Sequence, residues 1–416
     1  HLRHNTASPK GNHMENAQQP VRNKNEKTKK LPKSRISFWV TPIVFLIFFI
    51  GLFTLFAIPM GLSNMLSTVM NTAFALLTDT CLYIMAIAVI MGAVSALLTE
   101  FGVVAMLNHL LSPLMKPIYG LPGAAALGIV TTYLSDNPAI LSLAEDHGFR
   151  KYFKKYQLYG LTNLGTAFGM GLIVSTFMLG LGNIQGGSVV SAILIGNLGA
   201  IIGSVVSTRL MLMQTKKIFG TEEYVEDSAF DPSEQSSGGV RKKQSLGMRI
   251  LTAALDGGKS GVDIGLSIIP GVLVICTIVM MLTKGAPEGG VYTGAAYEGI
   301  SLLPRAANAI KFILQPLFGF SSTDAIAVPI TALGSAGAAT GIVKELAEAG
   351  SVTAHDIAVF TSMCMCWSGY LSTHASMMQS LKRPDLTGKA IASHTIGGLA
   401  AGVAANWLFK LFALIF

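Results

Sequence analysis

The residues best suited to chemistry lie in a stretch that is otherwise apolar. "TTYLSDNPAILSLAED", residues 131–146, places Asp136 and Asn137 directly before a proline. An ionisable side chain at membrane depth is costly, so it is by default a candidate for function. We expect Asp136 to be a cation ligand, a proton carrier or a hydrogen-bond acceptor for a bound solute. The structural alternative is that this segment caps a helix that begins at Pro138, since proline suits the first helical position.

Three further polar stretches are candidates for the same site. They are "TNLGTAFG" (162–169), "GSAGAATG" (334–341) and "CWSGYLSTHAS" (366–376). Together with Asp136 and Asn137, the predicted solute-binding residues are Asn163, Thr166, Ser335, Gly337, Thr340, Ser368, Ser372 and Thr373. The alternative for each is helix packing or interhelical hydrogen bonding, which contributes only about 0.6 kcal/mol on average. His374 is either a proton-coupling group or a buried histidine satisfied by its neighbours.

The composition places these stretches in a membrane. Hydrophobic residues make up 51% of the 416-residue chain and charged residues only 12%, against about 25% in soluble domains. No Asp, Glu, Lys or Arg occurs in residues 36–78, 156–208 or 357–381. Because a span needs roughly 20 apolar residues, each of the first two blocks can hold two spans. The sequence therefore predicts an all-α polytopic membrane protein.

The order of the chain suggests a duplication. "SPLMKPIYGLPGAAALGIVTTYLSDNPAILSLAED" aligns without a gap to "QPLFGFSSTDAIAVPITALGSAGAATGIVKELAEA", with Pro113 opposite Pro316 and Glu145 opposite Glu348. The predicted organisation is an expression-tag remnant (1–13), a basic disordered tail (14–37), a first span and connector (38–71), a first repeat (72–213), a soluble central loop (214–250) and a second repeat (251–416).

Charge distribution predicts how the two repeats are oriented. Basic loops near 145–155, 214–249 and 382–389, and the basic tail, should be cytoplasmic. All of them reach that side if residues 119–144 and 322–348 are re-entrant hairpins, which makes the halves an inverted repeat. Asn-Pro in the first hairpin and the glycines of the second interrupt helices. Broken backbone at membrane depth requires protein or a watery cavity around it.

Other functional classes find little support in the sequence. "AALDGGKSG" loosely resembles a phosphate-binding loop, but no strand precedes it and a membrane span follows. The four cysteines lie in apolar segments without a Cys-x-x-Cys pair, so we expect free thiols and no metal site. The basic clusters suit membrane anchoring better than nucleic-acid binding. We expect neither an enzyme nor a bound cofactor.

Three of these stretches resemble a known family. "YLSDNPAI", "TNLGTAFGMG" and "ALGSAGAATGIV" are similar to the Gate domain, also called the nucleoside-recognition domain, of bacterial inner-membrane proteins. The resemblance covers roughly residues 72–416. It implies a nucleoside-type or other small polar solute. Similarity to concentrative nucleoside transporters further implies opposed hairpins coupled to Na⁺ or H⁺.

These observations predict a multi-pass protein of the bacterial inner membrane with a cytoplasmic N-terminus. Its function would be secondary transport of a small polar solute, nucleoside-like or an organic acid, by alternating access at the hairpin tips. Asp136 and His374 are the candidate groups for ion or proton coupling. The expected partners are membrane lipids and the solute, with a homo-oligomer left open. The alternatives are a non-transporting sensor or scaffold that binds a small ligand, or a channel.

Overall fold

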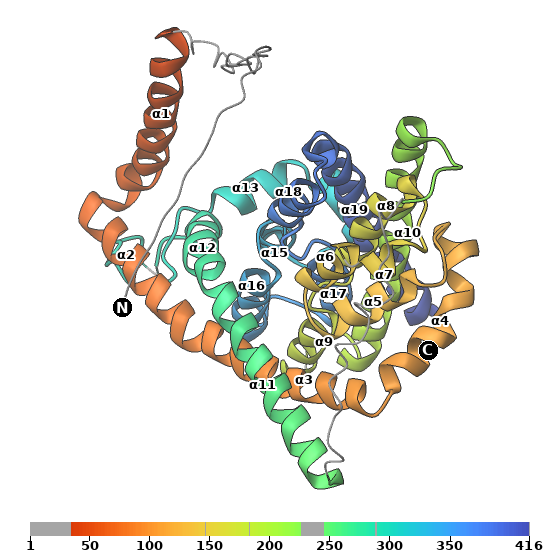
Figure 1. Ribbon diagram of the computed structural model, residues 1–416. Coiled ribbons are helices and arrows are strands. Elements are labelled where there is room, and N and C mark those ends of the chain that lie inside the picture. Colours follow the sequence, from red (N-terminus) through yellow and green to blue (C-terminus); the bar gives the residue numbers. More distant parts are fainter. Residues whose placement is uncertain (1–34, 146, 183, 226–244, 288, 416) are drawn as a thin grey trace, which may run out of the picture. The chain divides into compact units, whose positions relative to one another are not determined.

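The computed structural model describes residues 35–145, 147–182, 184–225, 245–287 and 289–415. These residues form helices without a β-strand (Figure 1). Six helical stretches among them are long and apolar enough to cross a membrane, and a seventh is present if a pair bent by 77°, Lys311–Phe318 and Thr323–Ala332, counts as one span. The predicted class, an all-α polytopic membrane protein, is confirmed.

The chain divides into two units, residues 1–54 and 55–416. In the first unit, the described residues 35–54 belong to α1 (Arg35–Met60), whose apolar side chains are largely exposed, as suits a helix in contact with lipid. The expected tag remnant, 1–13, and all but the last residues of the basic tail lie outside the described residues. Every candidate site residue belongs to the second unit.

Two long interrupted helices open the two halves of the second unit. Residues 62–100 run as α2 (Leu62–Ala75), a π-helical segment η1 (Leu76–Cys81) and α3 (Leu82–Glu100). Residues 246–283 run as α11 (Leu246–Gly271), a second π segment η4 (Val272–Cys276) and α12 (Thr277–Thr283). At 39 and 38 residues, both exceed the roughly 20 residues that cross a bilayer. The first of them starts at Leu62, ten residues before the predicted start of the first repeat at residue 72.

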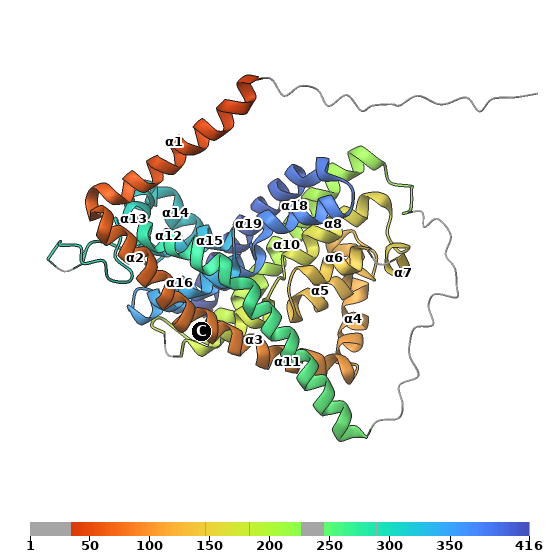
Figure 2. The same cartoon turned by 60° about the vertical axis from the view of Figure 1, so that its left-hand side comes forward.

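Small residues let α3 and α11 cross at close range, and the two helices lie side by side in Figures 1 and 2. A side chain on Gly261 would meet the backbone of Ala88 and Val89, and one on Gly257 would meet the backbone of Gly92. Backbone approach of this kind is the main way in which membrane helices associate without a hydrophobic driving force. We call this contact the glycine seam.

A compact bundle forms the other large contact of the unit. Its members are α8 (Lys155–Thr166), α10 (Val189–Phe219), α17 (Ala354–Cys366) and α19 (Thr387–Ile415). The two longest helices of this bundle, α10 and α19, also approach each other through glycine, because Gly203 faces the backbone of Gly397. Several polar residues of this bundle are buried, among them Asn163, Ser207 and His394.

Each half contains one helical hairpin. The first consists of α5 (Ala125–Leu134) and α6 (Pro138–Glu145), and the second of α15 (Ala327–Ala332) and α16 (Ala336–Glu348). The arms of the first lie side by side, since Ile140 fills the space beside Gly128. The second arm has 13 residues in α16 but only eight in α6.

Each half also contains a helix broken in the middle. α8 is followed after residues 167–170 by α9 (Gly171–Gly180), and α17 is followed after residues 367–369 by α18 (Tyr370–Ser380). The residue before each second helix has a left-handed backbone, with φ of 55° at Met170 and 63° at Gly369. We call residues 367–369 the 367–369 break. The charge-free block 357–381 is thus divided between two helices.

The hairpin lengths correct the register of the repeat. The ungapped alignment pairs Glu145 with Glu348, the last residues of α6 and α16, as the structure does. It fails at the tips. The first residues of the same helices, Pro138 and Ala336, are separated by five residues fewer than Glu145 and Glu348 are. The tip counterpart of Asn137 is consequently Ser335. A gap inside the hairpin is needed, which an ungapped comparison cannot supply.

The remaining elements connect these parts. They are α4 (Val103–Leu114), η2 (Met115–Tyr119), α7 (His147–Arg150), α13 (Leu302–Ala309), α14 (Lys311–Phe318), η5 (Thr323–Ile326) and η6 (Pro384–Leu386). Residues 103–119 are helical throughout, as α4 and η2. The central loop is shorter than expected, since α10 extends to Phe219 and α11 begins at Leu246; residues 226–244 of it lie outside the described residues.

A buried carboxylate organises the loop between α12 and α13. Glu298 is 4% exposed and accepts hydrogen bonds from the Thr293 hydroxyl at 2.6 Å and the Gly294 N–H at 3.0 Å. The loop is tied to α2, because the Asn71 amide donates to the Gly294 carbonyl at 2.8 Å. Burial acts to raise the pKa of Glu298, but the hydrogen bonds from Thr293 and Gly294 outweigh it and hold the pKa below its ordinary value.

We predict that Gly261→Ala lowers the thermal unfolding midpoint of the purified protein in detergent. The added methyl group must push α3 and α11 apart, and overpacking typically costs about 1–3 kcal/mol. Gly247→Ala is the matched control on the same helix, because nothing lies within 4 Å of its added methyl group. Equal midpoints for the two variants would contradict the glycine seam.

We also predict that Glu298→Gln destabilises the protein in a pH-dependent way. A lowered pKa in the folded state means that ionised Glu298 stabilises the fold above the unfolded pKa of about 4.3, and that this contribution disappears as pH falls through the folded value. The difference in unfolding midpoint between wild type and variant should therefore be present at neutral pH and shrink in acid. A constant difference at every pH would mean that the charge is not what holds the loop.

Candidate functional site

The tip of the first hairpin is bonded to the 367–369 break. The Asn137 side-chain amide, 4% exposed, donates to the Ser368 carbonyl at 2.5 Å and to the Thr373 hydroxyl at 3.3 Å. Thr373 in turn donates to the Gly369 carbonyl at 3.0 Å. The break frees helical carbonyls, and Asn137 satisfies one of them. The carbonyl oxygen of the Asn137 side chain has no partner among the described residues.

The second tip reaches the same break. The Gly369 N–H donates to the Ala332 carbonyl at 3.2 Å, at the end of α15. Ser335 caps α16 by accepting from the Ala338 N–H at 3.2 Å, the standard task of a serine at this position. Thr340 bonds only within its helix, to the Gly337 carbonyl at 2.8 Å. Both hairpins thus contact the 367–369 break, whereas the predicted pocket between the two tips stays a prediction.

A cavity of about 200 Å³ lies beside the first tip, between α6 and α18. It is lined by Asn137, Pro138, Leu141, Thr373, Ser376 and Met377. At about 30 Å³ for each water in the liquid, it has room for several waters or a small solute. Of the predicted binding residues, Asn137 and Thr373 line this cavity, which we call the α6–α18 cavity.

A second cavity of about 420 Å³ lies on the other side of the same tip. It is formed by α3, α4 and α11 together with the first hairpin, which contributes α5, Ser135 and Ala139. Its wall is largely apolar, with hydroxyl groups from Ser95, Thr99, Thr131, Ser135 and Ser260. The size is typical of small-molecule sites. Since Ser135 lines this α3–α11 cavity and Asn137 lines the α6–α18 cavity, the tip stands between the two.

Asp136 lies at the tip between these two residues. It is partly exposed, and one of its carboxylate oxygens accepts from the Asn137 N–H at 2.7 Å. This bond lies in the turn before α6 and pairs no N–H of the helix itself, so it is not the N-cap that the structural alternative expected. Asp136 does not line either cavity. Its predicted role as a coupling group stays a prediction.

Several other predicted residues lie away from the cavities. Asn163 ties α8 to α10 and α19 by donating to the Ser207 hydroxyl at 3.0 Å and the Ala390 carbonyl at 3.1 Å. Thr166 donates to the Thr162 carbonyl within its own helix at 2.8 Å. Gly337 gives room to Ile268 of α11. These contacts fit the packing alternative, and the predicted binding roles stay untested. The side chain of Ser372 lies outside the described residues.

The structure adds two residues that sequence reasoning missed, Ser207 and His394. His394 of α19 is fully buried, with Ser207 at 2.8 Å from one ring nitrogen and the Cys366 carbonyl at 2.5 Å from the other. Its ring lies edge to face with that of His374, at 4.8 Å between centroids. A histidine within a predicted span was an available signal, but only the fold shows that His394 meets His374.

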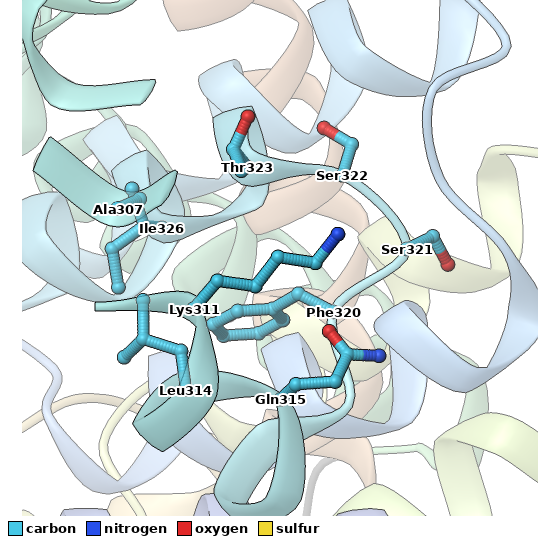
Figure 3. A pocket seen from close by; sticks show the side chains of 9 residues that line it. All are labelled: Ala307, Lys311, Leu314, Gln315, Phe320, Ser321, Ser322, Thr323 and Ile326. Carbon is cyan, nitrogen blue, oxygen red and sulfur yellow. The ribbon is translucent and has the colours of Figure 1, made fainter. Parts of the chain in front are cut away.

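A further pocket lies at the base of the second hairpin, between α14 and η5 (Figure 3). Figure 3 shows the side chains of Lys311, Gln315 and Phe320 around it, with three hydroxyl residues on the opposite wall. Its volume of about 30 Å³ suits about one water. None of the predicted site residues lines it, so it is not the basis of a function. No group of three or more metal-ligating side chains gathers within the described ranges.

Comparison with known proteins gives weak structural similarities. No protein-family model and no curated sequence matches the chain, so the resemblance to the Gate domain stays a prediction. Among solved structures, a double variant of the concentrative nucleoside transporter CNTnw in an outward-facing state aligns with TM-score 0.46 at 13% identity, over 80% of this chain and 76% of that one.

Two other CNTnw structures align in a similar way. An inward-facing, substrate-bound state gives TM-score 0.41 at 12% identity, over 80% and 75% of the two chains. A second double variant, also outward-facing, gives 0.44 at 14% identity over 89% and 84%. At these values the likeness assigns no activity to this chain.

Proposed function

We propose that the protein is a secondary transporter that moves a small polar solute across the membrane by alternating access at the hairpin tips. One observation supports this above all: the first tip separates two cavities and is tied by a side-chain amide to the 367–369 break. Discontinuous helices that meet near the middle of a membrane protein are typical of transporter binding sites.

The contact between tip and break is of a kind that can open. Within the described residues, Asn137 makes two side-chain hydrogen bonds from the first tip to the α17–α18 segment. A net hydrogen bond contributes only about 0.5–1.5 kcal/mol, so a solute that offers equivalent partners can compete for the same groups. Movement of the tip would then connect the solute to one cavity or the other. The tip is thus suited to act as the moving barrier.

The lining of both cavities favours an uncharged solute. Hydroxyl and amide groups supply the polar contacts, and no Lys, Arg, Asp or Glu lines either cavity in the described part of the chain. An anion would enter without a compensating cation, which is costly away from water, and Asp136 beside the tip adds to that cost. Of the two solute classes expected from sequence, the nucleoside-like one fits better than the organic acid.

The test is a binding screen followed by flux. Purified full-length protein is heated with uridine, adenosine, adenine and succinate, and any solute that raises the unfolding midpoint is then radiolabelled for uptake into proteoliposomes. We expect saturable uptake of a neutral solute and no effect of succinate. Binding without uptake would favour the sensor or scaffold alternative, and uptake that does not saturate would favour a channel.

We predict that Asn137→Ala reduces uptake of that solute at least tenfold. The substitution leaves the buried Ser368 carbonyl without its partner, which costs about 1–3 kcal/mol, and it removes a polar group from the cavity wall. Asn406→Ala is the matched control, because it likewise removes a buried side-chain amide that donates to backbone carbonyls, those of Pro316 and Leu317 at 3.2 and 2.9 Å, and it does so on α19 and α14 rather than at the first tip. Uptake reduced equally in both variants would show a general folding defect, and undiminished uptake in Asn137→Ala would remove the tip contact from the mechanism.

A further inference from the structure

The fully buried histidines His374 and His394 form a pair that the proposed transport cycle does not yet use. Both side chains have no exposed surface, and their rings meet edge to face at 4.8 Å between centroids. They lie on α18 and α19, in the bundle next to the 367–369 break. Buried imidazoles that contact each other are costly to charge together, because each would be a cation in the other's vicinity.

The hydrogen bonds of His394 determine which nitrogen carries its proton. The Cys366 carbonyl can only accept, so His394 Nε2, 2.5 Å away, must be the protonated nitrogen. In the neutral ring Nδ1 then accepts from the Ser207 hydroxyl at 2.8 Å. Ser207 itself accepts from the Asn163 amide at 3.0 Å. The chain of donors thus runs in one direction from α8 to the end of α17.

His374 differs from its neighbour in having no hydrogen-bond partner. Neither of its ring nitrogens is bonded within the described residues, although buried polar groups are nearly always paired. The other titratable groups around the pair are Tyr370, at 5.1 Å from the His394 ring and 6.2 Å from the His374 ring, and the Cys366 thiol on α17. From α10 the pair meets Ser207, which does not titrate and which is in turn bonded to Asn163 of α8.

No charged side chain compensates the pair. Among described residues, no Asp, Glu, Lys or Arg interacts with either ring. Arg209, two residues after Ser207, is exposed and donates to the carbonyls of Pro117 and Ile118. A proton on the pair would therefore be a net charge in a buried place. That is the property expected of a group that gains and loses a proton as the protein changes conformation.

We propose that His374 and His394 together bind a single proton, held on His394, and that this proton is the ion coupled to solute transport. The proton is taken from water when the pair becomes accessible and is added to His394 Nδ1. The Ser207 hydroxyl then rotates from donor to acceptor, so that the imidazolium donates to Ser207 and to the Cys366 carbonyl. His374 stays neutral. The inference rests on the proposed transport function.

The pair is connected to the tip through the backbone. His394 bonds to the carbonyl of Cys366, the last residue of α17, and Asn137 bonds to the carbonyl of Ser368, two residues later. A charge on His394 strengthens its bond to Cys366, since hydrogen bonds from charged donors are roughly twice as strong as neutral ones. The proton therefore fixes one side of the 367–369 break while the tip holds the other.

A titration tests the proton site without any solute. Full-length protein with ¹⁵N-labelled histidine rings, in lipid nanodiscs, is followed by NMR from about pH 9 to about pH 5, the range in which histidine ordinarily changes charge. We expect only one of the two buried rings to become an imidazolium. Its NMR signals should be the ones that are missing from the spectrum of His394→Gln. His109→Gln, at an exposed position on α4, should remove only its own signal. If both buried rings keep the ¹⁵N chemical shifts of neutral imidazole at every pH, the proposal is wrong.

Flux tests the coupling. In vesicles that take up a solute found by the screen above, a pH gradient of one unit should drive up to about tenfold accumulation if one proton moves with each solute. His394→Gln should keep solute exchange but lose the accumulation. Accumulation like wild type in His394→Gln, together with its loss in Asp136→Asn, would assign coupling to Asp136 and overturn the proposal. Absence of uptake by wild type would refute the transport function, while the titration would still decide the proton site.

Discussion

Inside a bilayer every backbone polar group must find its partner within the protein, and the 367–369 break is where this requirement is hardest to meet. The break and the helix end before it are satisfied from three directions: by Asn137 of the first hairpin, by His394 of α19 at Cys366, and by a backbone bond to the second hairpin at Ala332. Each partner comes from a different part of the sequence. The interrupted helix is stable only because the two halves of the chain are folded against each other around it.

Close approach of helices makes these bonds geometrically available. Glycines in α10 and α19 bring the two helices near enough for Ser207 and His394 to bond, and glycine again brings α3 to α11. A larger residue at these positions would move the polar partners beyond hydrogen-bond distance. The small residues set the distance between the helices, and the hydrogen bonds between buried polar side chains then determine which helices pair.

Much of the fold could be predicted from sequence because its signals are local. The charge-free blocks gave the helical membrane class, and the proline after Asn137 and the glycines around Ser335 marked the two tips. The register of the repeat could not be predicted, since the extra length of α16 appears only when helix ends are known. His394 was missed for a related reason: its role depends on Cys366 and Ser207, which are 28 and 187 residues away in the chain. Residues such as Asn163 were expected at the site by their type, whereas their contacts lie inside the bundle.

The glycine seam has a mechanical consequence. Two helices that interlock through large side chains must lift those side chains over one another before either helix can shift along its neighbour. Where α3 meets α11, backbone faces backbone over Gly92, Gly257 and Gly261, so there is little to disengage. Small sliding motions of packed helices are an established form of domain movement. The contact between α3 and α11 is therefore suited to small sliding movements, and it adjoins the larger of the two cavities.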